Sequence, residues 1–479
     1  MSDTVDLSGR PFHFIGIGGI GMSALAYILA QRQFPVSGSD LGSSRVTQRL
    51  KSAGVRIFEQ QAASNLAALA SGNGAAQPPQ VVCSSAIAST NHEYDAALQR
   101  GCAIWHRSDV LAALANERDS IAVAGTHGKT TTSSAIGHLL LQAGLDPTIA
   151  VGGEVETWGG NARLGQGRHL VAEADESDGT LAKLHPQIGV VTNIALDHPD
   201  RYASVEAAVQ TFATFARQCQ LLVGCLDCEQ VRTQLRPQVS YSLSPQTGAT
   251  YTATDIACGA QETTATVWER DRCLGQLRLQ LLGQHNLSNG LAAVAVGRQL
   301  GLSFATIAEA LGTFAGTKRR FEHRGCCNGI DVFDDYAHHP NEIRATLAAA
   351  RLRAAPAQRR VVAVFQPHRY SRAQALLNEF GDAFADADVV AVTDVYGAGE
   401  APGAVEGDRV AEAIAACHPR TRYHPTLAGL SEMLTGEILQ AGDLVILLAA
   451  GNLNQIVPNL LAQLEQQQVA ALSAEERVQ

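Results

Sequence analysis

The 479-residue sequence contains no run of about 18 consecutive apolar residues, which is the length that a membrane-spanning helix requires. Its first residues, MSDTVDLSGRPFHF, lack the basic segment and apolar core of a secretory signal. Charged residues make up only 17% of the chain, which argues against disorder. The net charge of −10 disfavours a nucleic-acid partner, because contacts with phosphates need clustered Lys and Arg. These absences predict a protein with no membrane segment and no nucleic-acid partner.

The chain also lacks the cysteine spacing of a zinc site. Its ten cysteines are scattered, mostly within apolar runs. Cys225 and Cys228 form a C-x-x-C pair, but no second pair stands at zinc-ligand distance, and Cys326 and Cys327 are simply adjacent. We therefore expect structural thiols in a reduced, cytoplasmic protein.

The length of 479 residues predicts about three domains, and the apolar residues, 46% of the chain, allow each domain to bury a core. The apolar runs predict α/β domains with doubly wound, mostly parallel sheets. Parallel strands covered on both faces give near-continuous apolar runs. The runs that fit this description are VVCSSAI (81–87), HLVAEAD (169–175), IGVVTNI (188–194), VVAVFQ (361–366), DVVAVTDV (388–395) and DLVILLAAG (443–451). A meander of short alternating runs from 251 to 283 interrupts the pattern. The predicted domains are 1–118, 119–317 and 318–479.

The segment IAVAGTHGKTTTSS (121–134) predicts a phosphate-binding loop between a strand and a helix N-terminus. Lys129 would reach the outer phosphates, and the Thr130 hydroxyl would face Mg²⁺. The usual pattern is G-x-x-x-x-G-K-[ST]. Here Val123 holds the first glycine position and Gly125 comes three residues before Gly128, so the loop is a shortened variant. The segment favours ATP or GTP binding over a plain glycine turn.

Two further candidates for the phosphate site follow strands. Glu173 ends HLVAEAD and begins an acidic stretch, where a carboxylate would suit a hard cation bound to phosphates. His198, in TNIALDHPDRY, also follows a strand, but His is an unusual Mg²⁺ ligand. On its own the acidic stretch also fits a solvated loop, and His198 a structural histidine.

GIGGIG (16–21) follows the first predicted strand and matches G-x-G-x-x-G at Gly16, Gly18 and Gly21. Asp40 comes near the position of the ribose-binding acid in dinucleotide folds. Such glycines select for diphosphate geometry, so NAD and another nucleoside diphosphate both fit.

Two polar segments of the C-terminal third are candidates for substrate contact. DDYAHHPNE (334–342) precedes a helix expected from Pro340, and fits a contact loop better than a metal site. QPHRYSR (366–372) follows a strand, and Arg369 and Arg372 would share one face if a helix has begun. An arginine pair suits a carboxylate or a phosphate, although it also fits a solvated basic face.

Taken together, these segments resemble the Mur ligase family over residues 12–452. Seven motifs occur in order, and together they are far more specific than any one alone. They are GTHGKTT (125–131), EADESD (173–178), TNI-x-x-DH (192–198), GQHNLSNGLAA (283–293), KRRFE (318–322), DDYAHHP (334–340) and QPHRYSR (366–372).

The resemblance implies three domains: an N-terminal Rossmann-like domain that binds a UDP-sugar rather than NAD, a central P-loop ATPase-like domain, and a C-terminal Rossmann-like domain that binds an amino acid. The implied UDP-sugar contacts are Gly16, Gly18, Gly19, Ile20, Gly21, Met22, Ser23, Asp40 and Ser84. The implied ATP contacts are Gly125, Thr126, His127, Gly128, Lys129, Thr130, Thr131, His285, Asn286, Asn289, Arg320 and Asp335.

The implied amino-acid contacts are Tyr336, His338, Arg369 and Arg372, and the implied residues around Mg²⁺ are Thr130, Glu173 and His198. Lys129, Arg320 and His338 would be catalytic. Several family members carry a carbamylated lysine soon after the DH motif, but residues 201–218 contain no lysine. That difference leaves the ligands of a second metal ion undefined.

The implied reaction is the ATP-dependent joining of L-alanine to the lactyl carboxylate of UDP-N-acetylmuramate through an acyl phosphate, in peptidoglycan precursor synthesis. We expect a cytoplasmic monomer or homodimer. Three alternatives remain at this point: a sibling ligase that adds a preformed tripeptide, an NAD-dependent oxidoreductase built on the first glycine loop, and a nucleotide-switched binding module.

Overall fold

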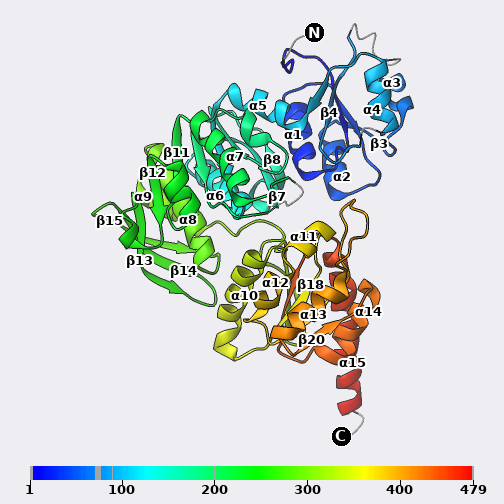
Figure 1. Ribbon diagram of the computed structural model, residues 1–479, viewed down its shortest axis with the longest axis vertical. Helices are drawn as coiled ribbons and strands as arrows, with labels where there is room; N and C mark the ends of the chain where they lie inside the picture. The colour runs from blue at the N-terminus through cyan, green and yellow to red at the C-terminus, as the bar shows by residue number, and fades with distance from the viewer. Residues whose placement is uncertain (1–3, 71–76, 89, 198–200, 477–479) are drawn as a thin grey trace.

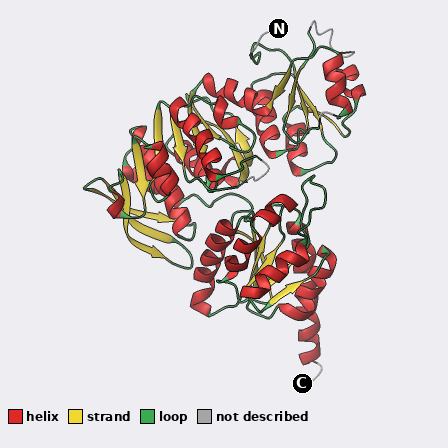
Figure 2. Ribbon diagram, in the orientation of Figure 1, coloured by secondary structure: helices red, strands yellow, loops and turns green. Residues whose placement is uncertain are grey.

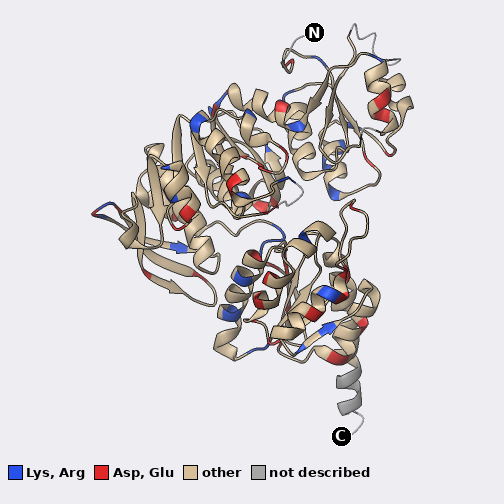
Figure 3. Cartoon of the chain, in the orientation of Figure 1, with Lys and Arg blue, Asp and Glu red and all other residues tan. Residues whose placement is uncertain are grey.

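A computed structural model describes residues 4–70, 77–88, 90–197 and 201–476. The chain forms three α/β bodies in sequence order, blue, cyan to green, and yellow to red in Figure 1. Figure 2 shows the same layering in each body, with helices packed on the faces of a twisted sheet. No helix in the described part is both long and apolar enough to cross a membrane. Charged residues of both signs are spread over all three bodies (Figure 3).

The N-terminal sheet has five parallel strands in the order β3-β2-β1-β4-β5. The strands are β1 (Phe12–Ile15), β2 (Val36–Ser39), β3 (Arg56–Phe58), β4 (Gln80–Cys83) and β5 (Ile104–His106). The helices are α1 (Ile20–Gln31), α2 (Arg45–Ser52), α3 (Ala63–Ala70), α4 (His92–Gln99) and α5 (Arg107–Asn116). Strand order reverses between β1 and β4, so the carboxyl edge there is the place where ligands of such sheets bind.

The middle sheet has ten strands in the order β15-β14-β13-β12-β11-β10-β6-β9-β7-β8. They are β6 (Asp119–Ala124), β7 (Thr148–Val155), β8 (Gly160–Arg163), β9 (His169–Glu173), β10 (Ile188–Val191), β11 (Leu221–Cys225), β12 (Val239–Ser242), β13 (Tyr251–Cys258), β14 (Thr263–Glu269) and β15 (Arg272–Leu279). Its helices are α6 (Lys129–Gln142), α7 (Val205–Gln218), α8 (Gln284–Gln299) and α9 (Phe304–Gly312). The predicted meander is the antiparallel unit β13-β14-β15 at one edge.

The C-terminal sheet has six strands in the order β16-β17-β21-β18-β19-β20, and only the β16–β17 pair is antiparallel. The strands are β16 (Glu322–Cys327), β17 (Ile330–Asp335), β18 (Val361–Phe365), β19 (Val389–Val392), β20 (Thr421–Tyr423) and β21 (Leu444–Leu448). The helices are α10 (Pro340–Ala354), α11 (Tyr370–Ala375), α12 (Leu377–Gly381), α13 (Gly407–Cys417), α14 (Leu427–Met433) and α15 (Val457–Glu476).

The predicted class, three α/β units with mostly parallel sheets, is confirmed, and the apolar runs form the central strands. β18 and β21 are buried along their whole length, as their uninterrupted apolar sequences predict. One expected strand, 81–87, is too long. β4 ends at Cys83, and Ser84 accepts a hydrogen bond from the backbone N–H of Ile87 in a partly exposed turn. The apolar residues of that run do not show that a turn begins after Cys83. This turn places Ser84 at the carboxyl edge of the sheet.

Candidate active site between the three bodies

β6, the loop after it and the N-terminus of α6 form the expected strand, loop and helix. Gly125 and Gly128 have φ angles of 138° and 81°, a region that side chains disfavour. A Cβ on Gly125 would lie 2.0 Å from Oγ1 of Thr192, and one on Gly128 would lie 2.6 Å from Oδ1 of Asn289. Both positions therefore require glycine, and α6 begins at Lys129 with its N-terminal N–H groups facing the loop.

Lys129 is held inside the loop. Its Nζ donates to the carbonyl of Gly125 at 2.6 Å and to Oε2 of Glu176 at 2.8 Å. Burial lowers the pKa of Lys129, but the nearby carboxylates, led by Glu176 and Asp175, outweigh it and raise the pKa well above its usual value. The lysine therefore stays charged, and phosphate oxygens can replace Glu176 as its partner.

Thr130 and Glu173 meet beside this lysine. The Thr130 hydroxyl donates to Oε2 of Glu173 at 2.8 Å, and the backbone N–H of Gly152 donates to the same oxygen at 2.8 Å. A hydroxyl and a carboxylate on a phosphate loop form the oxygen-donor set that Mg²⁺ prefers, with phosphates and water completing its shell. No group of three His, Cys, Asp or Glu side chains with metal-site geometry occurs in the described part. His198, the third predicted metal residue, lies outside the described residues.

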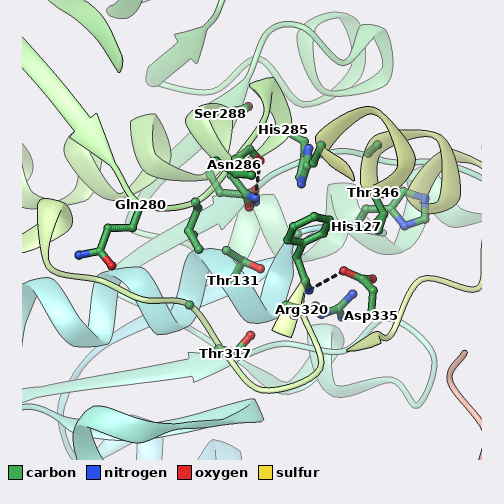
Figure 4. Close-up of a pocket in the computed structure, with 18 of the residues that line it drawn as sticks. His127, Thr131, Gln280, His285, Asn286, Ser288, Thr317, Arg320, Asp335 and Thr346 are labelled. Carbon is green, nitrogen blue, oxygen red and sulfur yellow. Dashed lines mark hydrogen bonds between the residues drawn. The ribbon is translucent and has the colours of Figure 1, made fainter. Parts of the chain in front are cut away.

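A cavity of about 1360 Å³ opens beside the loop, between the middle and C-terminal bodies. The middle body contributes His127, Thr131, His285, Asn286 and Asn289 to its wall. Thr317, at the end of the middle body, and Arg320 and Asp335 of the C-terminal body also line it (Figure 4). Nε2 of His127 and Oγ1 of Thr317 are buried and have no hydrogen-bond partner among the described residues. Unpaired buried polar atoms favour a polar ligand, and the volume suits a nucleotide.

Asp335 reaches this cavity from the end of β17. Its two carboxylate oxygens accept from the backbone N–H groups of Phe321 at 2.7 Å and Ala337 at 2.8 Å. Burial raises the pKa of Asp335 to about 6, and Arg320 opposes that rise. Each oxygen keeps a second lone pair, so the carboxyl group can still accept a ligand hydroxyl.

His338, ahead of α10, is held in one tautomer. Its Nδ1 lies 2.9 Å from the carbonyl oxygen of Tyr336, which can only accept, so Nδ1 carries the proton and Nε2 keeps a free lone pair. Burial lowers the pKa of His338 to about 4. The imidazole is therefore neutral near pH 7 and has a fixed acceptor nitrogen, but its lowered pKa makes it a weaker base than a free histidine. The helix does begin at Pro340, as expected.

The condition under which Arg369 and Arg372 would share a helix face is not met. α11 begins at Tyr370, and Arg369 precedes it with a left-handed φ of 67°. Arg372 lies inside the helix, where its Nε and Nη2 donate to Oδ1 of Asp197 at 2.9 and 2.7 Å. Arg369 instead places Nη1 3.9 Å from Oε1 of Glu400. The late start of the helix sends the two side chains in different directions.

The first glycine loop lies at the carboxyl edge of β1. Gly16 has a φ of 77°, and the backbone N–H groups of Gly16 and Ile17 donate to the carbonyl of Ser39. Asp40 turns back onto this loop, since its Oδ2 accepts from the N–H of Gly18 at 2.8 Å. The N–H groups of Gly16 to Gly19 are bonded within the protein, so the N–H groups that can bind a phosphate are those of the first turn of α1, which follows the loop directly.

The sequence does not reveal the partners of four residues that the structure brings to these loops: Arg107, Glu176, Asp197 and Glu342. Of these, Glu176 was expected only as a member of the acidic stretch after Glu173. Glu342 accepts from the backbone N–H of His338 at 3.1 Å and lies 3.2 Å from Nδ1 of His127, so it connects α10 to the phosphate loop. Three of the four lie within quoted motifs, EADESD, TNI-x-x-DH and the DDYAHHPNE segment. Their charges were visible, but their partners are distant in the chain.

Comparison with known proteins agrees with this arrangement. Three family models match in order: "Mur ligase family, catalytic domain" at 11–119, "Mur ligase middle domain" at 123–297, and "Mur ligase, glutamate ligase domain" at 319–451. The chain belongs to the Mur ligase family.

Within that family, several relatives of high identity are named UDP-N-acetylmuramate–L-alanine ligase. The protein from Microcystis aeruginosa is 59% identical over 96% of this chain and 97% of its own length. The protein from Nostoc punctiforme is 57% identical over 96% and 98%. The crystal structure of UDP-N-acetylmuramate-alanine ligase from Thermotoga maritima superposes with a TM-score of 0.81 at 28% identity, covering 95% of this chain and 99% of that one.

Proposed function

We propose that this chain is an ATP-dependent ligase that joins L-alanine to the lactyl carboxylate of UDP-N-acetylmuramate, a step in peptidoglycan precursor synthesis. The observation that carries the proposal is the convergence of three elements. Gly128 and Thr131 of the Lys129 loop and Arg320 and Asp335 of the C-terminal body line one cavity, and Arg372 of α11 joins the C-terminal body to the middle body through Asp197. The names of the relatives support the particular substrates.

The proposed chemistry has two steps. A carboxylate oxygen of the sugar nucleotide attacks the γ-phosphorus of ATP, and ADP leaves with the electrons of the broken P–O bond. The neutral amine of alanine then attacks the acyl carbon, and phosphate departs with the former carboxylate oxygen as the amide forms. The first step is needed because an unmodified carboxylate oxygen is a poor leaving group, whereas the phosphorylated oxygen leaves as phosphate.

Two negatively charged groups must approach each other in the first step. Lys129, in the loop beside the cavity, and Arg320, in the cavity wall, would offset this repulsion and stabilise charge on the transferring oxygens. Thr130 and Glu173 would hold Mg²⁺, which supplies charge neutralisation for the nucleotide phosphates when it is bound.

The proposed alanine site lies at the start of α11. Arg372 would bind the alanine carboxylate through two parallel N–H groups, with Asp197 as its present partner. Nε2 of His338 would accept the ammonium proton before attack, because Nδ1 is committed to the Tyr336 carbonyl. Tyr336 and Arg369 would complete the site.

Three domains, 1–118, 119–317 and 318–479, would each bring one reactant. Holding reactants in near-attack geometry can contribute about 7–11 kcal/mol, and closure excludes water that would hydrolyse the acyl phosphate. The ten free cysteines and the need for ATP support a cytoplasmic location. A monomer or homodimer without nucleic-acid or membrane partners remains our prediction.

The test measures ADP release with UDP-N-acetylmuramate and either L-alanine or a preformed tripeptide. The proposal expects turnover that requires both the sugar nucleotide and alanine. Faster turnover with the tripeptide would identify the sibling ligase instead. ATP hydrolysis that ignores the sugar nucleotide would identify a nucleotide-switched binding module, and protection by NADH would favour the oxidoreductase.

A further inference from the structure

The guanidinium of Arg107 lies between the start of α1 and the acidic segment after β9. Arg107 is the first residue of α5, the helix that lies between α1 and the middle sheet in Figure 1. A Cβ on Gly21 would be 2.7 Å from Nη1 of Arg107 and 3.3 Å from its Cζ. The arginine is therefore packed against the first turn of α1, and the last glycine of GIGGIG is the residue that makes room for it.

The other side of the same guanidinium meets the middle body. Nη2 of Arg107 lies 2.5 Å from Oδ2 of Asp178 and 3.2 Å from Oδ2 of Asp175. Both acids follow β9 and flank Glu176, the carboxylate that pairs with Lys129. Arg107 thus connects the first glycine loop to the acidic segment beside the second.

Arg107 and Asp178 are in charge contact but do not form a well-aligned hydrogen bond. Oδ1 of Asp178 accepts from the backbone N–H of Thr180 at 3.0 Å and from its hydroxyl at 2.5 Å. Oδ2, in a side chain only 5% exposed, accepts no aligned hydrogen bond among the described residues. A charge contact without aligned geometry is weaker than a forked guanidinium–phosphate pair, so a phosphate can displace it.

We propose that Arg107 binds the diphosphate of the sugar nucleotide together with the N-terminus of α1, and that Asp178 holds the guanidinium in position until the diphosphate replaces it. The inference rests on the proposed function, because it needs a nucleoside diphosphate at GIGGIG. It adds a ligand from outside the glycine loop and makes that ligand part of the contact with the middle body. Sugar-nucleotide binding then involves the acidic segment next to Lys129.

The test compares binding of UDP and uridine by calorimetry, using the full chain. Arg107→Gln is expected to weaken UDP binding about 10- to 100-fold, the loss of charge-assisted hydrogen bonds, and to leave uridine binding unchanged. Arg107→Lys is expected to recover part of the loss. Asp178→Asn keeps the Oδ1 acceptor for Thr180 and removes the competing charge, so it should tighten UDP binding about threefold.

Lys183→Gln is the matched control, because Lys183 pairs with Asp109 of α5 at 2.6 Å across the same boundary without meeting the glycine loop. It should leave UDP binding unchanged. Equal UDP affinity in wild type and Arg107→Gln, or weaker binding by Asp178→Asn, would overturn the inference and leave the proposed ligase intact. Absence of UDP binding by the wild-type chain would overturn both. If Arg107→Gln does not fold, the sign of the Asp178→Asn effect still decides.

Discussion

Arg372 and Asp197 lie 175 positions apart in the chain and form a buried ion pair, with Nη2 2.7 Å from Oδ1. The arginine belongs to the C-terminal body and the aspartate to the loop after β10. A buried arginine needs a carboxylate partner, because an unpaired buried charge is costly. The pair therefore joins two bodies at the place where an amino-acid carboxylate is expected to bind.

We expect Arg372→Met to lower kcat/KM for alanine more than about a hundredfold, since two charge-assisted hydrogen bonds to the substrate carboxylate are lost. ATP binding, measured separately by calorimetry, should change little. Arg344→Met is the control, because Arg344 is an exposed arginine of the same body that bonds to Asn341 and a backbone carbonyl. An unchanged kcat/KM in Arg372→Met would place the alanine carboxylate elsewhere.

The phosphate loop gives a glycine prediction. Gly128→Ala should weaken ATP binding strongly, because its Cβ would lie 2.6 Å from Oδ1 of Asn289 and displace the loop. Gly144→Ala is matched, since Gly144 also has a positive φ, 75°, but nothing lies within 4 Å of the added Cβ. Gly144→Ala should cost only the backbone strain, about 1 kcal/mol of unfolding free energy, and keep full ATP affinity. Similar ATP affinities in the two variants would contradict the loop assignment.

The strand–loop–helix around Lys129 could be predicted from sequence because every part of it is local. The apolar run of β6, the glycines and the start of α6 lie within one short segment, and the backbone alone determines the result. The edge of the N-terminal sheet was harder to predict. An apolar run does not reveal where β4 ends at Cys83 and a turn begins.

The charged contacts between bodies could not be predicted. Arg107 meets Asp178, and Arg372 meets Asp197, only because the three bodies pack in one particular way. No periodicity in the sequence encodes that packing. The side-chain directions of Arg369 and Arg372 likewise depend on the residue at which α11 starts, and a shift of one position separates them.

The position of Glu173 beside Thr130 predicts how activity depends on the Mg²⁺ concentration. Glu173→Gln should raise the Mg²⁺ concentration for half-maximal activity about tenfold or more, because the carboxylate that faces Thr130 loses its charge. The measurement is a Mg²⁺ titration of ADP release at saturating ATP. Asp271→Asn, an exposed carboxylate between β14 and β15, serves as control and should leave the titration unchanged. Identical titrations for Glu173→Gln and wild type would remove Glu173 from the metal site.

Three neighbouring histidines predict how stability depends on pH. Burial lowers the pKa of His338 and of His339 to about 4 and that of His368 to about 3. Since an unfolded histidine has a pKa near 6.5, the unfolded chain binds more protons than the folded chain between these values. The free energy of unfolding therefore keeps its full value from these histidines above about pH 6.5, and it falls as the pH drops toward 4. Asp335, whose pKa burial raises to about 6, opposes this trend.

Urea unfolding at several pH values between about 4.5 and 7 measures this dependence. The urea midpoint should fall on acidification, and His368→Asn should reduce the slope by removing one of the titrating groups. His323→Asn is the control, because His323 is a half-exposed histidine of the same body. A slope that His368→Asn leaves unchanged would contradict the buried, neutral state of this cluster.

The central claim is that ATP activates the sugar-linked carboxylate as an acyl phosphate. The most direct measurement uses UDP-N-acetylmuramate labelled with ¹⁸O in its lactyl carboxylate, with ATP and L-alanine, and analyses the released inorganic phosphate by mass spectrometry. Each phosphate is expected to carry one labelled oxygen, and Lys129→Ala is expected to abolish the transfer. Amide formation with unlabelled phosphate would contradict the central claim.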